Sequence, residues 1–268
     1  MSGMGRVLPG IAMAAAWILL LVLAPVPLFW LCIVLVTARA LFEFGRMTGL
    51  AVPGLQRGVL AVVLLLPVLA SLAGSVQGVA AGLTGGLLGL VVLILRRYSN
   101  LDDVLRCLSL AITGLVYISF CGAHVVLLRH LEHGAAWLFI LTVITAASDT
   151  GAYYAGRAFG RRKLCPAISP GKTVAGGVGG LAAGIVCAVI AGLILLPGVH
   201  PLRLGLVAAL LVVIGVAGDL TESVIKRATG CKDSGTLLAG HGGLLDRVDS
   251  ILLTAPVLYY LLVYGLVA

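Results

Sequence analysis

Long runs of apolar residues follow one another along almost the whole chain of 268 residues, and they constrain its fold more than any other feature. An α-helix needs roughly 20 apolar residues to cross about 30 Å of hydrocarbon. Runs near this length occur at residues 8–24, 28–46, 57–74, 78–95, 105–128, 134–157, 174–196, 203–226 and 245–266. Because only 10% of the residues are charged, against roughly a quarter in a soluble domain, we expect an all-α polytopic membrane protein with about nine transmembrane helices.

The basic residues sort to one side of these predicted spans. If the N-terminus is cytoplasmic, 16 of the 18 Lys and Arg residues face the cytoplasm, and Arg129 and Arg203 face outward. Cytoplasmic loops carry such an excess of Lys and Arg. The pattern therefore predicts a cytoplasmic N-terminus and explains the net charge of +8 without a nucleic-acid partner. We expect a single membrane domain, 1–268, with N-terminal spans in 1–130 and the spans that carry the polar cluster in 131–268.

Glycines recur at a spacing of four in two of the predicted spans, which places them on one helix face. Small residues allow helices to approach closely in a bilayer. We therefore predict close helix packing along two strips of residues, Gly82 and Gly86 with Gly85 and Gly89, and Gly176, Gly180 and Gly184.

Half of the ten acidic residues lie in one stretch of 31 residues, at the cytoplasmic ends of the last two predicted spans: Asp219, Glu222, Asp233, Asp246 and Asp249. A sixth, Asp149, ends another apolar run. Carboxylates at membrane depth are costly and usually serve a function. Because divalent cations of the hard type prefer oxygen ligands, we expect Asp219, Asp246, Asp249 and Asp149 to hold one. The alternative is a set of buried ion pairs, with Asp246 and Asp249 as charges at a helix N-terminus.

Hydroxyl, basic and glycine residues accompany these carboxylates. Asp219, Ser223 and Lys226 are spaced i, i+4, i+7 and share one helix face. A Gly-rich turn around His241, with Gly242 and Gly243, comes just before the last span and offers N–H groups that suit phosphate. The cations suited to neutralise a polyphosphate are Lys226, Arg227, Lys232 and Arg247.

A second polar segment, 148–173, follows Asp149. Lys172 is expected in a Ser-Pro-Gly-Lys-Thr turn and in contact with a substrate phosphate. A P-loop is excluded because Pro166, and not Gly, stands five residues before Gly171. The basic run 161–163 is interpreted as an orientation signal that meets anionic headgroups.

The 223–249 stretch resembles the CDP-diacylglycerol synthases, also called phosphatidate cytidylyltransferases. The residues that carry the resemblance are Ser223, Lys226-Arg227, Lys232-Asp233, Gly235, His241-Gly242-Gly243, Asp246-Arg247 and Asp249. Asp149-Thr-Gly-Ala-Tyr and Ser169-Pro-Gly-Lys-Thr are also similar to that family. The likeness covers roughly the C-terminal half, and it departs from the family's pattern at Thr236 and Ala239, where the family often has Asn and usually has Pro.

The resemblance implies that CTP and phosphatidate react to give CDP-diacylglycerol and pyrophosphate, with Mg²⁺ and room for a second cation. It implies a catalytic set of Asp219, Ser223, Lys226, Arg227, Lys232, Asp233, His241, Asp246, Arg247 and Asp249. The residues expected to bind CTP are Lys172, Lys226, Arg227, Lys232, Gly242 and Gly243. We also expect a homodimer, and a multi-pass location in the plasma (inner) membrane with the active site facing the cytoplasm.

Two other functions stay open from the residues. One is a related phosphotransferase or nucleotidyltransferase that acts on another lipid. The other is an ion-coupled transporter that uses Asp149, Asp219 and Asp246. Transport carboxylates belong near the middle of the membrane with access from both sides, whereas these lie at cytoplasmic helix ends beside four cations, which favours a soluble polyphosphate as ligand.

Overall fold

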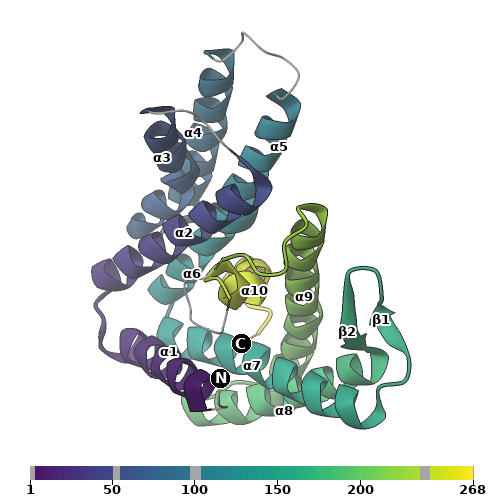
Figure 1. Cartoon of the computed structure of the whole chain (residues 1–268). Helices are drawn as coiled ribbons and strands as arrows, with labels where there is room; N and C mark the ends of the chain where they lie inside the picture. The colour runs from purple at the N-terminus through teal and green to yellow at the C-terminus, as the bar shows by residue number, and fades with distance from the viewer. Residues whose placement is uncertain (1–3, 51–54, 97–103, 236–241, 268) are drawn as a thin grey trace. The chain divides into compact units, whose positions relative to one another are not determined.

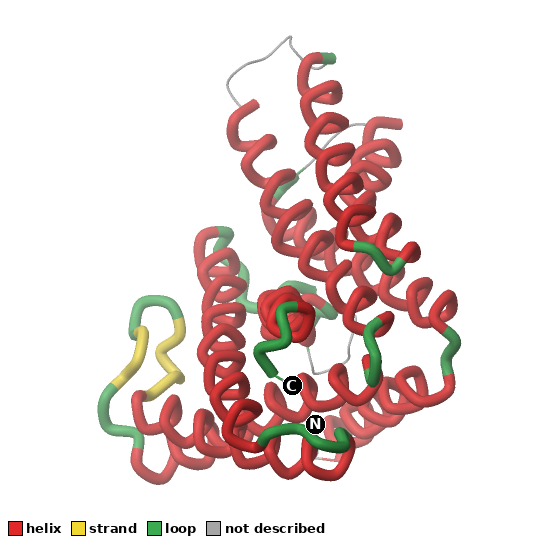
Figure 2. The backbone as a smooth tube through the Cα atoms, turned by 180° about the vertical axis from the view of Figure 1, so that it is seen from behind, coloured by secondary structure: helices red, strands yellow, loops and turns green. Residues whose placement is uncertain are grey.

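The computed structural model describes residues 4–50, 55–96, 104–235 and 242–267. In this part of the chain the regular structure is helical except for one short hairpin (Figures 1 and 2). The helices are α1 (Met4–Leu23), α2 (Val26–Thr48), α3 (Leu55–Ala70), η1 (Ser71–Ala73), α4 (Val76–Leu95), α5 (Val104–Thr113), η2 (Gly114–Phe120), α6 (Cys121–His130), α7 (Gly134–Phe159), α8 (Val174–Leu195), α9 (Pro201–Ala228) and α10 (Leu245–Val263). Each predicted span contains a helix, which confirms the all-α polytopic class.

Seven helical segments within the described ranges are long and apolar enough to cross a membrane. They are Val26–Thr48, Gln56–Ala73, Val76–Leu95, Val104–His130, Gly134–Phe159, Val174–Leu195 and Pro201–Ala228. In α1 the apolar part, Gly10–Leu23, is shorter, and α10 carries Asp246, Arg247 and Asp249 near its start. The count of nine spans and the cytoplasmic N-terminus stay predictions.

Local signals set several helix ends. α2 follows Pro25 and ends at Gly49, whose φ of 69° is a left-handed conformation that glycine adopts without strain. The Ser75 side chain accepts a hydrogen bond from Gly78 N at the start of α4. In the same way Thr173 Oγ1 accepts one from Gly176 N at 3.0 Å and begins α8.

By its contacts the chain divides into two compact units. Unit 1 comprises Met1–His130 and Thr229–Arg247, and unit 2 comprises Leu131–Ala228 and Val248–Ala268. The loop between α9 and α10 belongs with the N-terminal spans. The expectation of a single membrane domain, 1–268, stays a prediction.

Unit 1 packs its helices around α3 and the π-helical segment η2. A Cβ added at Gly82 of α4 would lie 2.6 Å from the Leu66 carbonyl oxygen of α3, and one at Gly86 would lie 2.8 Å from Leu115 Cδ1. The predicted close packing along this glycine strip is therefore confirmed. A hydrogen bond of 2.9 Å from Trp30 Nε1 to the Val68 carbonyl oxygen joins α2 to α3.

Unit 2 is organised around the pair α7 and α8, which lie side by side in both views (Figures 1 and 2). The buried face of α8 includes Gly176, Gly180 and Gly184. A Cβ at Gly180 would lie 2.8 Å from the Ser148 carbonyl oxygen of α7. The second predicted strip is thus also confirmed as a packing surface, and it brings the end of α7 that carries Asp149 close to the start of α8.

The hairpin between α7 and α8 consists of β1 (Lys163–Cys165) and β2 (Ser169–Thr173), which pair antiparallel with Cys165 opposite Ser169. The prediction of a turn at Ser169–Thr173 is wrong, because this segment forms the second strand. The turn lies in 166–168 instead, where the Ile168 N–H donates to the Cys165 carbonyl oxygen at 3.2 Å. The strand leads directly into α8 and places Lys172 next to the start of that helix.

Candidate functional site

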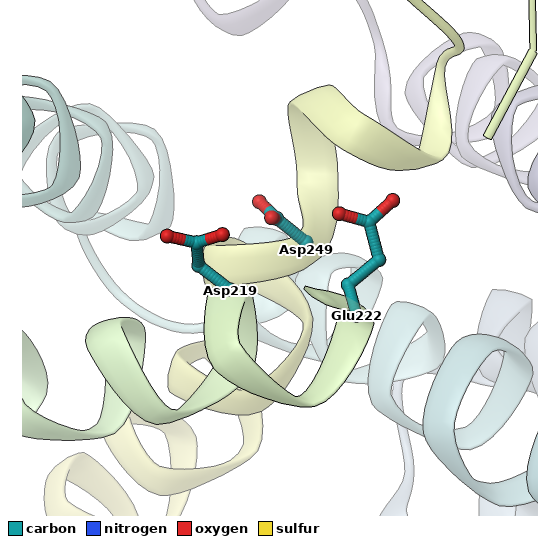
Figure 3. Close-up of side chains that lie close together, drawn as sticks. All are labelled: Asp219, Glu222 and Asp249. Carbon is teal, nitrogen blue, oxygen red and sulfur yellow. The ribbon is translucent and has the colours of Figure 1, made fainter. Parts of the chain in front are cut away.

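Three carboxylates gather where α9 and α10 meet in unit 2. Asp219 and Glu222 come from α9 and Asp249 from α10, and each offers one oxygen within 4.8 Å of the others. Figure 3 shows the three side chains on the same side of the two helices. Glu222 is fully buried and Asp249 is 8% exposed, whereas Asp219 is about one-third exposed. The acidic cluster is therefore open to a ligand at Asp219.

Gly218 explains how α9 and α10 approach closely enough to form this acidic cluster. A Cβ at this position would lie 2.8 Å from the Asp249 carbonyl oxygen, so a larger residue would push the helices apart. Because Gly218 directly precedes Asp219, the closest contact between the two backbones coincides with the carboxylates.

Two lysines balance part of the charge. Lys226 Nζ lies 2.7 Å from Glu222 Oε2, one helical turn away. Lys172, on β2, forms an ion pair with Asp219 Oδ2. Three carboxylates against two ammonium groups leave one negative charge if all five are ionised. Lys226 shares a helix face with Asp219 in the sequence pattern, and in the structure it forms an ion pair with Glu222.

A pocket of about 230 Å³ lies beside Asp219 in unit 2, between the end of α7, the hairpin and α8. Its polar lining includes Asp149, Lys172 and Asp219. A smaller recess of about 10 Å³, also lined by Asp149 and Asp219, is close to the space that one water-sized particle needs. The pocket is smaller than typical sites of about 300–1,000 Å³ for whole ligands, so it suits a group such as a phosphate.

The acidic cluster fits a small divalent cation. Mg²⁺ takes oxygen ligands at about 2.0–2.1 Å, so opposite ligands lie about 4.2 Å apart. At most one pair among three ligands can be opposite, and neighbouring ligands of an octahedral Mg²⁺ lie about 2.9 Å apart. The oxygens of Asp219, Glu222 and Asp249, which lie within 4.8 Å of one another, would therefore draw closer together around a bound ion. A cation there would also offset the cost of burying Glu222 and Asp249 beside a third carboxylate.

Asp246 lies in unit 1, at the start of α10. Its Oδ2 atom accepts hydrogen bonds from Ser234 N at 3.0 Å, Ser234 Oγ at 3.0 Å and Gly243 N at 2.8 Å. The sequence predicts that the Gly243 N–H is free to bind phosphate. In the structure it donates to Asp246 instead. Ligation of a metal by Asp246 stays a prediction.

The other predicted site residues differ in their contacts and in their exposure. Ser223 Oγ makes a long hydrogen bond of 3.5 Å to Asp219 Oδ1, and Arg227 Nε donates to the Ile168 carbonyl oxygen of the hairpin at 3.3 Å. Lys232, Asp233 and Arg247 are exposed, and Gly242 adopts a positive φ of 80°. His241 lies outside the described residues.

Glu222 is not among the metal ligands that the sequence predicts. The available signal was its spacing, because Glu222 follows Asp219 at i+3 and therefore lies on the same helix face. The i, i+4, i+7 pattern of Asp219, Ser223 and Lys226 does not include Glu222.

Comparison with known proteins gives an independent finding. Residues 4–265 match the model of the cytidylyltransferase family. A phosphatidate cytidylyltransferase of Bacillus subtilis is 36% identical over 263 residues, which cover 96% of this chain and 96% of the relative. One of Staphylococcus haemolyticus is 32% identical over 242 residues, covering 88% and 89%, and one of Haemophilus influenzae is 42% identical over 132 residues, covering 48% and 46%.

The similarity therefore extends over nearly the whole chain, and the expected restriction to the C-terminal half is wrong. The N-terminal spans are rich in interchangeable apolar residues, so they carry few short motifs that a single sequence displays. Their relationship becomes visible only when the full length is compared.

Proposed function

We infer that this chain, which belongs to the cytidylyltransferase family, transfers the cytidylyl group of CTP to phosphatidate, forming CDP-diacylglycerol and pyrophosphate. The observation that carries this proposal is the acidic cluster of Asp219, Glu222 and Asp249, with Lys172 and Lys226 paired to it. It occurs in a membrane protein whose relatives of nearly equal length are phosphatidate cytidylyltransferases.

In this reaction a phosphate oxygen of phosphatidate attacks the α-phosphorus of CTP. A new P–O bond forms there, and the bond from the α-phosphorus to the oxygen that bridges to the β-phosphorus breaks. The electron pair leaves with pyrophosphate. Both substrates are anionic, so the protein's task is to position them and to neutralise their charge.

We propose Mg²⁺ as the cation, held by Asp219, Glu222 and Asp249 with Asp149 nearby in the same unit. When bound, it supplies a positive charge that stabilises phosphate oxygens during transfer. The carboxylates fix its place, and the tight approach at Gly218 keeps Asp249 against α9. A second cation remains part of the proposal and would use the recess that Asp149 and Asp219 line.

Lys172 has the position for a contact with CTP. It lines the pocket beside Asp219 and is one-quarter exposed. With Asp219 holding a cation, the Lys172 ammonium group would turn from that carboxylate to a phosphate and donate a charge-assisted hydrogen bond, which is of the stronger kind. Lys226 is less exposed, at 14%, and its ion pair orients Glu222.

The proposed location is the inner membrane, with the site facing the cytoplasm. Two features support the cytoplasmic side of the membrane. The segments that carry Lys172 and Lys226 belong to the Lys- and Arg-rich face of the chain, and CTP is a soluble substrate that must reach the site from water. Phosphatidate would arrive from the lipid phase.

The test is formation of labelled CDP-lipid from CTP and phosphatidate by the purified protein, with and without Mg²⁺. Asp219→Asn and Asp249→Asn are expected to lower turnover by about 100-fold or more, because each removes the negative charge and replaces one carboxylate oxygen by an amide nitrogen that cannot bind Mg²⁺. Glu132→Gln removes the same charge at a position whose side chain is 91% exposed in unit 2, and it should retain wild-type turnover.

A wild-type protein that makes no CDP-lipid with Mg²⁺ present would overturn the proposal. Turnover with another phosphorylated lipid, but not with phosphatidate, would assign the chain to the alternative lipid substrate. An ion-coupled transporter would instead bind no CTP, which equilibrium binding of labelled nucleotide would reveal.

A further inference from the structure

A buried glutamate in the N-terminal spans contacts the loop that precedes α10. Glu43, on α2, is 1% exposed. Its Oε1 atom pairs with Arg39 Nη2 at 2.9 Å, as the i, i+4 spacing predicts. Its Oε2 atom accepts hydrogen bonds from Ser234 Oγ at 3.2 Å and from Leu245 N at 2.9 Å. The ion pair with Arg39 therefore accounts for only one of its two oxygens.

Glycines make room for this carboxylate. A Cβ at Gly235 would lie 2.8 Å from Glu43 Oε1, and one at Gly243 would lie 2.5 Å from Glu43 Oε2. A larger residue at Gly235 would therefore displace the Glu43 side chain, and one at Gly243 would also meet the backbone nitrogen of Gly235 at 2.7 Å. Gly235 belongs to the stretch that carries the family resemblance, and the contact gives it a physical role in packing.

Ser234 links Glu43 to Asp246. Its hydroxyl lies 3.2 Å from Glu43 Oε2 and 3.0 Å from Asp246 Oδ2. A hydroxyl has one proton to donate, so it serves one carboxylate at a time, while the Ser234 N–H donates to Asp246. Ser234 is 6% exposed, so water does not readily replace these contacts.

Glu43 also contacts the beginning of α10 directly. The first N–H groups of a helix lack partners within the helix, and Leu245 N is the first of α10. A carboxylate from α2 satisfies it. One side chain thus contacts both Ser234, which precedes α10, and Leu245, the first residue of α10. Asp246 comes directly after Leu245.

We propose that Glu43 is a positioning residue for the cytidylyl transfer. It fixes Ser234 and the start of α10, so that the carboxylate of Asp246, which the sequence predicts as a metal ligand, keeps one orientation. This inference rests on the proposed function. It gives α2, which the sequence predicts only as a span, a role in the reaction. Glu43 acts through Ser234 and Leu245, and it does not itself contact a substrate.

The test is Glu43→Gln, which keeps the size of the side chain and removes its charge. Loss of a partner of this kind typically lowers metal affinity or activity by about 10-fold to 100-fold. We expect kcat to fall by that factor, the KM for CTP to change by less than about threefold, and the Mg²⁺-induced rise in melting temperature to shrink. The last readout needs no turnover.

Two further variants separate positioning from simple stabilisation. Arg39→Gln breaks the ion pair and leaves both hydrogen bonds of Glu43 Oε2, so we expect lower thermal stability with kcat near that of the wild type. Ser234→Ala keeps the Glu43 carboxylate and removes the shared hydroxyl, so we expect kcat about 10-fold lower. It also replaces Glu43→Gln as the test if that variant does not fold.

Folded Glu43→Gln or Ser234→Ala protein with wild-type kcat and an unchanged Mg²⁺-induced rise in melting temperature would overturn the proposal. The failure of the proposed function is a different result, because the wild-type protein itself would then make no CDP-diacylglycerol.

Discussion

Replacement of Gly218 by Ala tests whether the approach of α9 to α10 builds the acidic cluster. The added Cβ would lie 2.8 Å from the Asp249 carbonyl oxygen, and contacts tighter than 3.4 Å are uncommon for real Cβ atoms. The oxygen belongs to one helix backbone and the Cβ is bonded directly to the other, so no flexible side chain can move aside. The helices must separate locally by about 0.6 Å, the difference between these two distances.

This displacement exceeds what the site tolerates. Functional groups need to stay within about 0.5 Å of their productive geometry, and a misplacement of 1 Å can cost about 100-fold in rate. We therefore expect Gly218→Ala to lower turnover by between about 10-fold and 100-fold and to raise the Mg²⁺ concentration needed for half-maximal rate. The cost of overpacking, about 1–3 kcal/mol, is partly offset by the better helix propensity of Ala, by about 1 kcal/mol.

The assay is the initial rate of CDP-lipid formation against Mg²⁺ concentration, with thermal unfolding in detergent beside it. Gly205→Ala is the matched control on the same helix, because its added Cβ would meet Ile185 Cγ2 at 3.7 Å, an ordinary contact. A Gly218→Ala enzyme whose rate and Mg²⁺ dependence equal those of Gly205→Ala would refute the argument that this contact sets the cluster.

Three further changes test other parts of unit 2. Lys172→Gln should raise the KM for CTP by about 10-fold to 100-fold, since a hydrogen bond to a charged group contributes about 1.5–3 kcal/mol; an unchanged KM would remove Lys172 from the CTP site. Glu222→Gln should lower turnover by about 10-fold to 100-fold, because it removes one carboxylate of the cluster and the partner of Lys226; steady-state kinetics that match the wild type would contradict this role. Gly151→Leu should destabilise the protein by at least about 1–3 kcal/mol, because a Cβ there would lie 2.6 Å from Ala183 Cβ. Thermal unfolding measures this loss, and Gly177→Leu, whose added Cβ meets nothing within 4 Å, should not show it.

The helical framework was predictable because lipid imposes one simple requirement. Each span must be an apolar run of a certain length, and length and apolarity are visible in one sequence. The two glycine strips were predictable for the same reason, since a spacing of four identifies a helix face. The hairpin was not predictable in this way, because Pro170 and Gly171 are poor strand formers. β2 depends on pairing with Lys163–Cys165, and no local sequence pattern indicates that contact.

The acidic cluster shows the same limit. Asp219 and Asp249 were selected because intramembrane carboxylates are conspicuous, and the structure brings them together. Glu222 lies in the same stretch, three residues after Asp219, but it is not predicted as a ligand. The role of Glu43 could not be predicted from the sequence. An ion pair with Arg39, four residues away, is a sufficient local explanation for this carboxylate, and its other partners are 191 and 202 residues away.

The long separation between Glu43 and Leu245 has a consequence for biosynthesis. The hydrogen bond joins residues 202 positions apart, and ribosomes add about 5–20 residues per second, so roughly 10–40 s pass between the synthesis of the two partners. During that interval α2 carries a carboxylate whose Oε2 atom awaits the loop that follows α9. The nascent N-terminal helices therefore lack these two hydrogen bonds of Glu43 until the start of α10 has been synthesised.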